Sequence, residues 1–186
     1  MKALYRYLAE NDIDEGLVEH VLPYFRQKKY EKGSALLTMG QNTRMICFIM
    51  KGLVRGYFIN ENGREVTKCF SAEGEWCCIY NMLTEMPSQF WIEALEDCVL
   101  AEINVDRLKG LLGQEIKLQT LFTKLFSAAF MDTDEKSTVL QRLPASERYL
   151  LFLEKYPKLR ERVKQEDIAS YIGITPASLS RIKRSL

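Results

Sequence analysis

The hydrophobic and polar positions of the chain follow three successive patterns. Residues 1–26 place apolar side chains near helical spacing until Pro23 interrupts them. From Gly33 to about Val105, glycines separate short runs rich in β-branched and aromatic residues, which is typical of strands. Beyond Val105 the apolar spacing becomes helical again. The sequence therefore predicts one or two short N-terminal helices, a β-domain and a helical C-terminal region.

The β-domain is predicted from six short runs: "SALLTM", "MICFIM", "LVRGYFIN", "EVTKCFS", "FWIEA" and "CVLAEIN". The stretch "YFINENGREVTKCF" indicates a hairpin, because Asn62-Gly63 accepts the positive φ angles that a tight turn requires. Several short strands at this spacing favour a β-sandwich or barrel over a parallel sheet.

In the helical region, Gly110 and Gly113 are expected to separate a short helix from a long one that begins near Gln114. The long helix carries more apolar surface than one face against a sheet would use. A second apolar seam on a helix usually packs against another helix, and a copy of itself is the simplest partner. The alternative is that both faces pack within one monomer. The predicted dimer seam comprises Leu118, Leu121, Phe122, Leu125 and Ala129.

The segment "KQEDIASYIGITPASLSRIKRSL" predicts two helices joined by a short turn. We expect a first helix over 165–173 and a second helix that Thr175 caps and Pro176 starts. Ala169 is small where the helices must cross, and Gly173 accepts the conformation that leaves the first helix. The apolar positions that fix the angle between the helices are Ile168, Ile172, Ile174, Leu179 and Ile182. This combination is the helix-turn-helix pattern.

The other face of the second helix is polar and basic, which fits the major groove of DNA, roughly 12 Å wide. Arg181 is the expected reader of a base, because a guanidinium donates two hydrogen bonds to guanine. The predicted base contacts are Pro176, Ala177, Ser178 and Arg181. The predicted phosphate contacts, which set the register on the duplex, are Lys164, Gln165, Thr175, Ser180, Lys183 and Arg184.

The distribution of charge agrees with a nucleic-acid partner. Residues 143–186 hold nine Lys and Arg against five Asp and Glu, a net +4, whereas residues 1–142 hold 17 against 20, a net −3. Positive charge at the end that carries the two-helix segment is what a phosphate backbone requires. A helical hairpin with a solvated basic face remains the alternative interpretation.

The whole chain resembles the Crp/Fnr-type bacterial transcription regulators. The resemblance rests on "GSALLTMGQNTRMICFIMKGLVRGYFINENGREVTKCFSAEGEW", "WIEALEDCVLAEINVDRLKGLL", the long helix with "TDEK", and residues 165–182. It implies an α+β fold: an N-terminal double-stranded, jelly-roll-like β-roll, a long dimerisation helix and a C-terminal all-α helix-turn-helix domain. The corresponding domains are a cyclic-nucleotide-binding-like sensor with flanking helices at 1–112, the dimerisation helix at 113–142 and the DNA-binding domain at 143–186. The β-hairpin wing that usually follows the recognition helix in this family is not evident in the sequence.

The resemblance also implies partners. These are a second copy of the chain and near-palindromic double-stranded DNA, with the two recognition helices in major grooves about 34 Å apart. RNA polymerase and an unknown small-molecule effector are the other partners that it suggests.

The predicted sensor departs from the nucleotide-binding members of the family. In those members an acid holds the ribose hydroxyl, and an Arg about ten residues later holds the cyclic phosphate. Here Ile79 or Tyr80 stands in place of the acid, and Ser88-Gln89 stands in place of Arg-Ser. Residues 70–106 contain eight acidic residues and no Lys or Arg. An anionic phosphodiester would meet like charges there, so we expect no binding of cyclic AMP or cyclic GMP in the family manner.

Aromatic and polar residues around the same segment offer a pocket for a different effector, or simply a filled core. The residues that would line such a pocket are Trp76, Tyr80, Ser88, Gln89, Phe90, Trp91 and Thr133. We expect no bound cofactor.

Other classes of function find less support. Five cysteines without a Cys-x-x-Cys spacing argue against a disulfide framework and a zinc knuckle, so we expect no metal site. The adjacent Cys77-Cys78 would sense oxidants only if exposed and of low pKa. A cupin-like enzyme needs several histidines, and His20, expected at the surface, is the sole one. No catalytic constellation is recognisable, so we expect no enzyme.

A β-roll regulatory protein that acts through protein contacts without binding DNA is the other alternative. The chain has no apolar run of the roughly 18 to 20 residues that would cross a bilayer. Its first residues do not resemble a secretory signal. We therefore expect a cytoplasmic protein without membrane contact.

Overall fold

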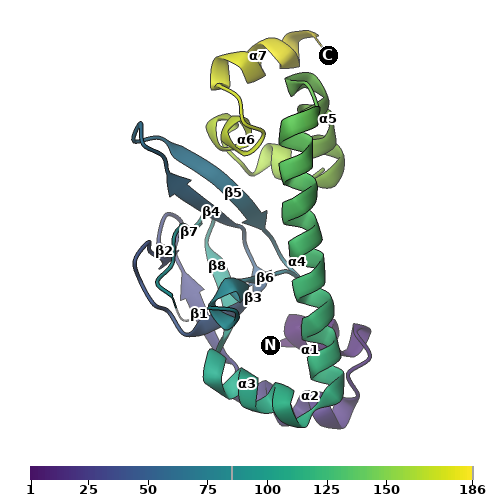
Figure 1. The fold of residues 1–186 in the computed structure, drawn as a ribbon. Helices are drawn as coiled ribbons and strands as arrows, with labels where there is room; N and C mark the ends of the chain where they lie inside the picture. The colour runs from purple at the N-terminus through teal and green to yellow at the C-terminus, as the bar shows by residue number, and fades with distance from the viewer. Residues whose placement is uncertain (85, 186) are drawn as a thin grey trace. The chain divides into compact units, whose positions relative to one another are not determined.

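The computed structural model describes residues 1–84 and 86–185. The chain forms two compact units, each built from two segments. The first unit comprises Met1–Gly56 and Phe70–Ser127, and the second comprises Tyr57–Cys69 and Ala128–Leu186. Figure 1 shows the strands, the N-terminal helices and the C-terminal helices along the chain.

Short helices open the first unit, as the sequence predicts. They are α1 (Lys2–Glu10), α2 (Glu15–Val21) and the 3₁₀ turn η1 (Leu22–Tyr24). The Asp14 side chain caps α2 by accepting a hydrogen bond from the Leu17 N–H at 3.1 Å. The apolar sides of these helices face the core, where Leu4, Leu8 and Val18 are buried.

The strands form two four-stranded sheets. In order across the first sheet they are β1 (Arg26–Tyr30), β8 (Cys98–Asn104), β3 (Met45–Lys51) and β6 (Trp76–Cys77). The second sheet holds β2 (Ala35–Leu37), β7 (Trp91–Ala94), β4 (Val54–Ile59) and β5 (Glu65–Ser71). Each predicted run contains a strand. The sequence missed β1, whose residues are mostly charged, and β6, which has only two residues.

The predicted hairpin is present, but its turn differs from the one expected. Gly63 has a positive φ of 72°, whereas Asn62 is not among the described residues with positive φ. The Asn60 side chain instead accepts hydrogen bonds from the N–H groups of Asn62 and Arg64, both at 3.0 Å. A side chain that bonds backbone groups two and four residues on replaces one of the two left-handed residues.

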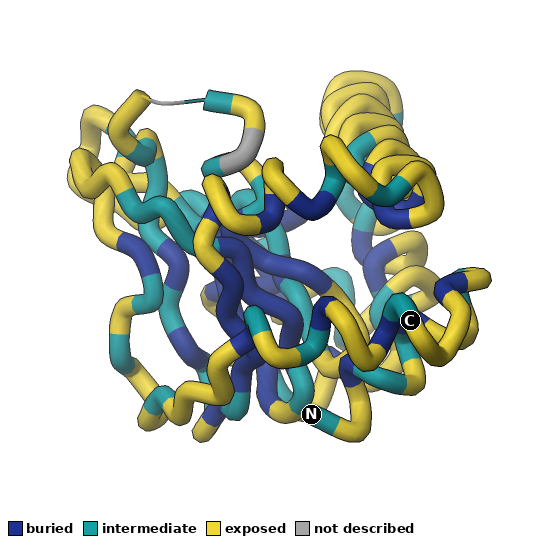
Figure 2. The backbone as a smooth tube through the Cα atoms, turned by 90° about the horizontal axis from the view of Figure 1, so that it is seen from below, coloured by how far each residue is buried: buried dark blue, intermediate teal, exposed yellow. Residues whose placement is uncertain are grey.

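Buried residues gather on the central strands of the sheets, drawn dark blue in Figure 2. One core cluster joins the first sheet to the helices of the first unit. Trp76 lies at its centre, with ring centroids 5.3 Å from Phe48 and 5.2 Å from Phe122. These edge-on arrangements are favourable for aromatic rings.

After β8 come α3 (Val105–Gln114) and the long α4 (Ile116–Arg142). Asn104 caps α3 by accepting hydrogen bonds from two N–H groups of its first turn. The two glycines expected to separate the helices, Gly110 and Gly113, lie within α3, and the break falls at Glu115. Glycine is tolerated inside a helix at about 1 kcal/mol relative to alanine, so its presence alone did not locate the end.

The second unit contains α5 (Ala145–Lys155), the 3₁₀ turn η3 (Leu159–Glu161), α6 (Gln165–Tyr171) and α7 (Pro176–Ser185). Phe152, Tyr156 and Tyr171 form a cluster of rings with centroids 5.4 to 5.8 Å apart. No helix within residues 1–84 and 86–185 combines the length and apolar character that crossing a bilayer requires.

Candidate nucleic-acid interface

The two-helix segment folds as predicted. Ala169 and Leu179 are fully buried where α6 and α7 pack together, and Ile168 and Ile172 are each 3% exposed. Because the small side chain of Ala169 lets the helices approach closely, the apolar positions fix their angle. The structure thus contains a helix-turn-helix, although α6 ends at Tyr171, two residues before the predicted end.

Gly173 makes the turn between the helices. Its φ is +71°, a conformation that favours glycine. The N–H groups of Gly173 and Ile174 bond back to carbonyls of α6 at 3.2 and 2.9 Å. A Cβ at Gly173 would lie 3.1 Å from a methyl carbon of Leu140 and 3.3 Å from a guanidinium nitrogen of Arg148. The backbone conformation therefore selects glycine here, and a Cβ would in addition require these two side chains to shift by a few tenths of an ångström.

Thr175 caps α7, as predicted. Its hydroxyl accepts a hydrogen bond from the Ser178 N–H at 3.2 Å and shares another with the Ser178 hydroxyl at 3.0 Å. Pro176 follows at the first helical position, where no N–H is needed. Because Ser178 is half-buried and bonded to the cap, it is less available to a base than its neighbours.

The exposed face of α7 carries Ala177, Ser180, Arg181 and Arg184, and Pro176 is exposed at its start. These positions recur at helical spacing opposite the buried Leu179. Lys183 is half-buried and lies to the side of this face, since it follows Leu179 by four residues. Lys164 and Gln165, at the start of α6, are exposed in the same unit. We call Ala177, Ser180, Arg181 and Arg184 the outer face of α7.

A set of contacts that the sequence did not reveal supports α6. The Ser170 hydroxyl donates to the Glu65 carbonyl at 3.0 Å and accepts from the Thr67 N–H at 2.8 Å. The Lys136 ammonium donates to the carbonyls of Thr67 and Lys68 at 3.0 and 2.8 Å. The hairpin of β4 and β5 is thereby attached to α4 and α6 within the second unit.

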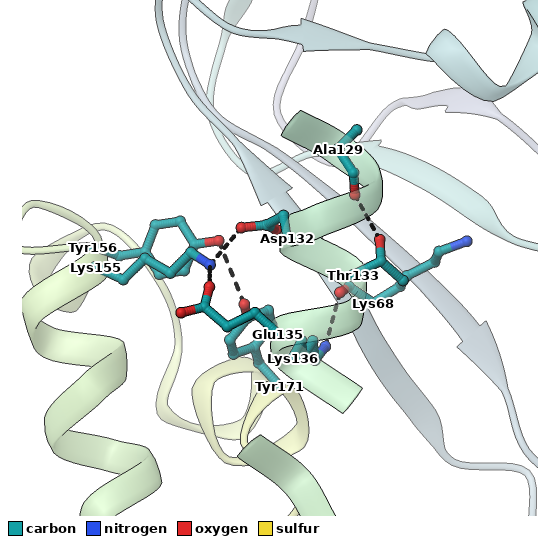
Figure 3. Close-up of polar contacts among 9 residues, drawn as sticks. All are labelled: Lys68, Ala129, Asp132, Thr133, Glu135, Lys136, Lys155, Tyr156 and Tyr171. Atoms are coloured by element: carbon teal, nitrogen blue, oxygen red, sulfur yellow. Dashed lines mark hydrogen bonds and ion pairs between the residues drawn. The ribbon is translucent and has the colours of Figure 1, made fainter. Parts of the chain in front are cut away.

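Figure 3 shows the surroundings of this attachment. The Lys136 ammonium lies 3.8 Å from the centroid of the Tyr171 ring, a cation–π contact. Lys155 pairs with Asp132 and, at 2.7 Å, with Glu135 on the neighbouring turn of α4. Burial lowers the pKa of Lys136 to about 8. No local sequence signal could have found the hydrogen bonds of Lys136 and Ser170 to the hairpin, because they join residues 68 to 105 positions apart.

The predicted effector pocket is not assembled as expected. Trp76 is 7% exposed and packs among the rings of the core. Tyr80 is 53% exposed, and its ring lies 6.3 Å from that of Phe90. The Ser88 hydroxyl is bonded to the Phe90 carbonyl at 2.7 Å. The correction has a simple cause: an aromatic residue beside polar ones fills a core as well as it lines a pocket.

The remaining predicted pocket residues lie at or near the surface. Gln89 is exposed and Trp91 is half-buried. Thr133 belongs to the second unit and bonds the Ala129 carbonyl of its own helix at 2.9 Å, as Figure 3 shows. A cavity of about 590 Å³ lies elsewhere, beside α2 and α3, where the exposed His20 lines it.

Arg55 is a buried cation of the first unit that the sequence did not single out. It is 3% exposed and its guanidinium pairs with the Glu93 carboxylate at 2.9 Å. A buried cation matched by an acid offers no free charge to an anionic ligand. The pair involves one of the eight acids of residues 70–106 and leaves the other seven in excess over the bases of that segment.

The predicted dimer seam needs correction. Leu118, Leu121 and Phe122 are 2%, 5% and 3% exposed because they belong to the core of the first unit. Leu125 also packs against that core, and Ala129 is half-buried. Residues already covered by their own monomer cannot form the main contact with a second copy.

A different face of α4 is exposed, and we call it the α4 stripe: Ile116, Thr120, Thr123, Ser127 and Phe130. Ile116 and Phe130 are each 72% exposed. The spacing alternates between four and three residues, which is the seam spacing of a coiled coil. The Thr120 and Thr123 hydroxyls bond carbonyls of the same helix at 2.9 and 2.8 Å, so the methyl groups remain to pack.

The thiols of the first unit do not suit reaction with oxidants. Cys77 and Cys78 are each 5% exposed. Hydrogen bonds with the neighbouring thiols and burial raise the pKa of Cys77 well above its usual value. A buried protonated thiol is a poor nucleophile.

Comparison with known proteins agrees with this architecture. Residues 27–115 match the family described as "Cyclic nucleotide-binding domain". The chain is 26% identical over 186 residues to the "Anaerobic regulatory protein" of Haemophilus influenzae, covering 94% of this chain and 70% of the relative. It is 24% identical to the "Fumarate and nitrate reduction regulatory protein" of Yersinia pestis, and the match covers 94% of this chain and 72% of that relative.

Solved structures share the fold. FixK2 from Bradyrhizobium japonicum superposes with a TM-score of 0.77 at 18% identity, covering 87% of this chain and 84% of the other. The catabolite activator protein of Thermus thermophilus superposes with a TM-score of 0.62 at 20% identity, covering 94% and 84%. Taken with the helix-turn-helix and the β-roll, these similarities support a DNA-binding transcription regulator of the Crp/Fnr type.

Proposed function

We propose that the protein binds near-palindromic duplex DNA as a homodimer and reads each half-site with the outer face of α7. The observation that carries the proposal is that Arg181 and Arg184 stand exposed on this face, held by a buried Leu179 and a capped first turn. A helix of this kind enters the major groove with its N-terminal residues at base edges.

The structure supports distinct roles for the side chains of this interface. Arg181, one turn into the helix, is suited to two hydrogen bonds with a guanine. Ala177 is suited to an apolar contact, such as a thymine methyl group. Lys164 and Gln165 at the start of α6, together with Ser180 and Arg184, are suited to phosphates. Lys183 would reach a phosphate only from the side of α7.

The α4 stripe is the surface that we propose for the second copy. Thr120, Thr123 and Ser127 present methyl or small side chains between the exposed Ile116 and Phe130. None of these five residues is charged, so two copies of the stripe can pack together without burying an unpaired charge.

We further propose that the β-roll takes no cyclic nucleotide. The pairing of Arg55 with Glu93 and the acidic character of residues 70–106 support this. Isothermal titration with cyclic AMP and cyclic GMP checks it. Micromolar or tighter binding by either nucleotide would contradict it.

A selection of duplexes from a random pool, followed by fluorescence anisotropy, tests DNA binding. The affinity of the selected duplex should exceed that of random duplex and should fall steeply with salt, because binding releases counterions from several phosphates. Arg181→Ala should weaken the binding of the selected duplex by about 1 to 3 kcal/mol and relax the sequence preference at one base pair. Arg160→Ala, the same change at an exposed position of η3, is the control and should leave affinity unchanged. Equal binding of selected and random duplex would refute the proposal.

A further inference from the structure

Three cysteine thiols converge inside the β-roll of the first unit. Cys47 lies on β3, and Cys77 lies directly opposite it on β6. Cys78 follows at the end of that strand. The three side chains are 2%, 5% and 5% exposed, and their Sγ atoms all lie within 4.8 Å of one another. Cys47 lies 30 residues before Cys77 in the sequence, so the sheet register joins it to the adjacent pair. The sequence, from which we expected no metal site, does not reveal this group.

An unusual backbone conformation completes the group. In a regular strand, successive side chains point to opposite faces, so Cys77 and Cys78 would diverge. Cys78 instead has a φ of +60°, in the left-handed region that costs a non-glycine residue roughly 1 to 2 kcal/mol. This turn of the backbone is what allows two consecutive thiols to face Cys47 together.

A carboxylate borders the three thiols. One oxygen of Glu102, on β8, lies 4.0 Å from the Cys47 sulfur. Glu102 is 8% exposed, accepts a hydrogen bond from the Tyr30 hydroxyl at 2.5 Å, and lies 3.8 Å from the Lys28 ammonium. The Glu102 carboxylate is therefore a possible oxygen ligand beside the thiols, and the Lys28 ammonium offsets part of its negative charge.

The spacing of the sulfurs suits one metal ion. A thiophilic ion bound at about 2.3 Å from each sulfur brings three thiolates to roughly 4 Å from one another. The observed group is only slightly wider. Thiolates are the ligands that Zn²⁺ and Cu⁺ prefer, and cysteine groups in a protein without disulfides often serve metals.

We propose that Cys47, Cys77 and Cys78 bind one thiophilic metal ion as three thiolates. Each thiol releases its proton to solvent as its sulfur bonds the ion, and no electron is transferred. Zn²⁺, which takes four ligands, would add an oxygen of Glu102, whereas Cu⁺ is satisfied by three sulfurs.

Titration of the reduced, full-length protein with Cd²⁺, Zn²⁺ and Cu⁺ tests the site. Cd²⁺ reports thiolate bonding through its ligand-to-metal charge-transfer absorbance. We expect one ion per chain and a melting temperature that rises with the concentration of metal. Cys77→Ser should lower the affinity at least tenfold. Cys98→Ser, a change at another buried thiol that lies outside the group, is the matched control and should bind as the native chain does.

The variant Cys78→Gly removes one thiol of the group with the least disturbance of the backbone. Glycine accepts the left-handed backbone without cost, so this variant should remain folded by circular dichroism while losing the charge-transfer band. The proposal fails if the native chain takes up no ion, if Cys78→Gly binds like the native chain, or if Cys98→Ser loses as much affinity as Cys77→Ser. Because no DNA is present, the result is independent of the proposed DNA binding.

Discussion

The charge of Lys136 should make the stability of the second unit depend on pH. The ammonium is half-buried and bonded to the carbonyls of Thr67 and Lys68, beside the Tyr171 ring. Burial lowers its pKa from 10.5 to about 8. Between these values the unfolded chain keeps a proton that the folded chain has released. The free energy of unfolding therefore rises with pH across this window and is lowest, with respect to this group, below pH 8.

The magnitude follows from the size of the shift. Holding Lys136 charged at neutral pH costs about 3 kcal/mol of stability relative to pH above 10.5. About 1 to 2 kcal/mol of this should be regained between pH 7 and pH 9. The neutral amine keeps two N–H donors, so both carbonyl hydrogen bonds can persist as the proton leaves.

Urea unfolding of the native protein and of Lys136→Met at pH 7, 8 and 9 measures the effect. Methionine has a similar length and cannot titrate, so the stability of the native protein should rise relative to that of the variant. Lys155→Met is the control. Burial opposes the charge of Lys155, but its pairs with Asp132 and Glu135 hold its pKa above the usual value, so it stays protonated in both states. If the free energy of unfolding of the native protein exceeds that of Lys136→Met by the same amount at pH 7, 8 and 9, the lowered pKa of Lys136 is refuted.

Four further changes test other parts of the structure. Gly173→Ala should lower the free energy of unfolding by about 1 to 2 kcal/mol, because alanine resists the left-handed turn; urea unfolding measures it. Thr175→Ala should cost about 1 kcal/mol by removing the cap of α7, by the same assay. Thr123→Arg with Ser127→Arg should yield folded monomers by light scattering, whereas dimers would exclude the α4 stripe. Arg55→Ala should lower the free energy of unfolding in urea by about 1 to 3 kcal/mol, because it deprives the partly buried Glu93 carboxylate of its buried partner, and an unchanged stability would contradict this pairing.

The features that the sequence predicted well have local signatures. The helix-turn-helix follows from Ala169, Gly173, Thr175 and Pro176, each of which has a conformational reason to stand where it does. The strands follow from runs separated by glycine, and β1 was missed because a charged edge strand lacks the apolar signal.

The errors arose where one pattern has two physical outcomes. Leu118 and Leu121 are apolar enough for a dimer seam or for a monomer core, and the structure places them in the core. Thr120 and Thr123 look polar in the sequence, yet their hydroxyls are bonded to carbonyls of α4, which leaves their methyl groups to pack against a partner. Which face a helix buries depends on contacts with residues far away in the chain.

The hairpin of β4 and β5 bears on how the DNA-binding part can be isolated. Tyr57–Cys69 belongs to the second unit, although Phe70–Ser127 of the first unit separates it in the sequence from the rest of the second. A fragment that starts at Ala128 would leave the Ser170 hydroxyl and the Lys136 ammonium without the backbone groups that they bond. Excising the C-terminal helices would thus yield an incomplete folding unit. Supplying the hairpin as a separate peptide, rather than lengthening the fragment at its ends, is the way to restore it.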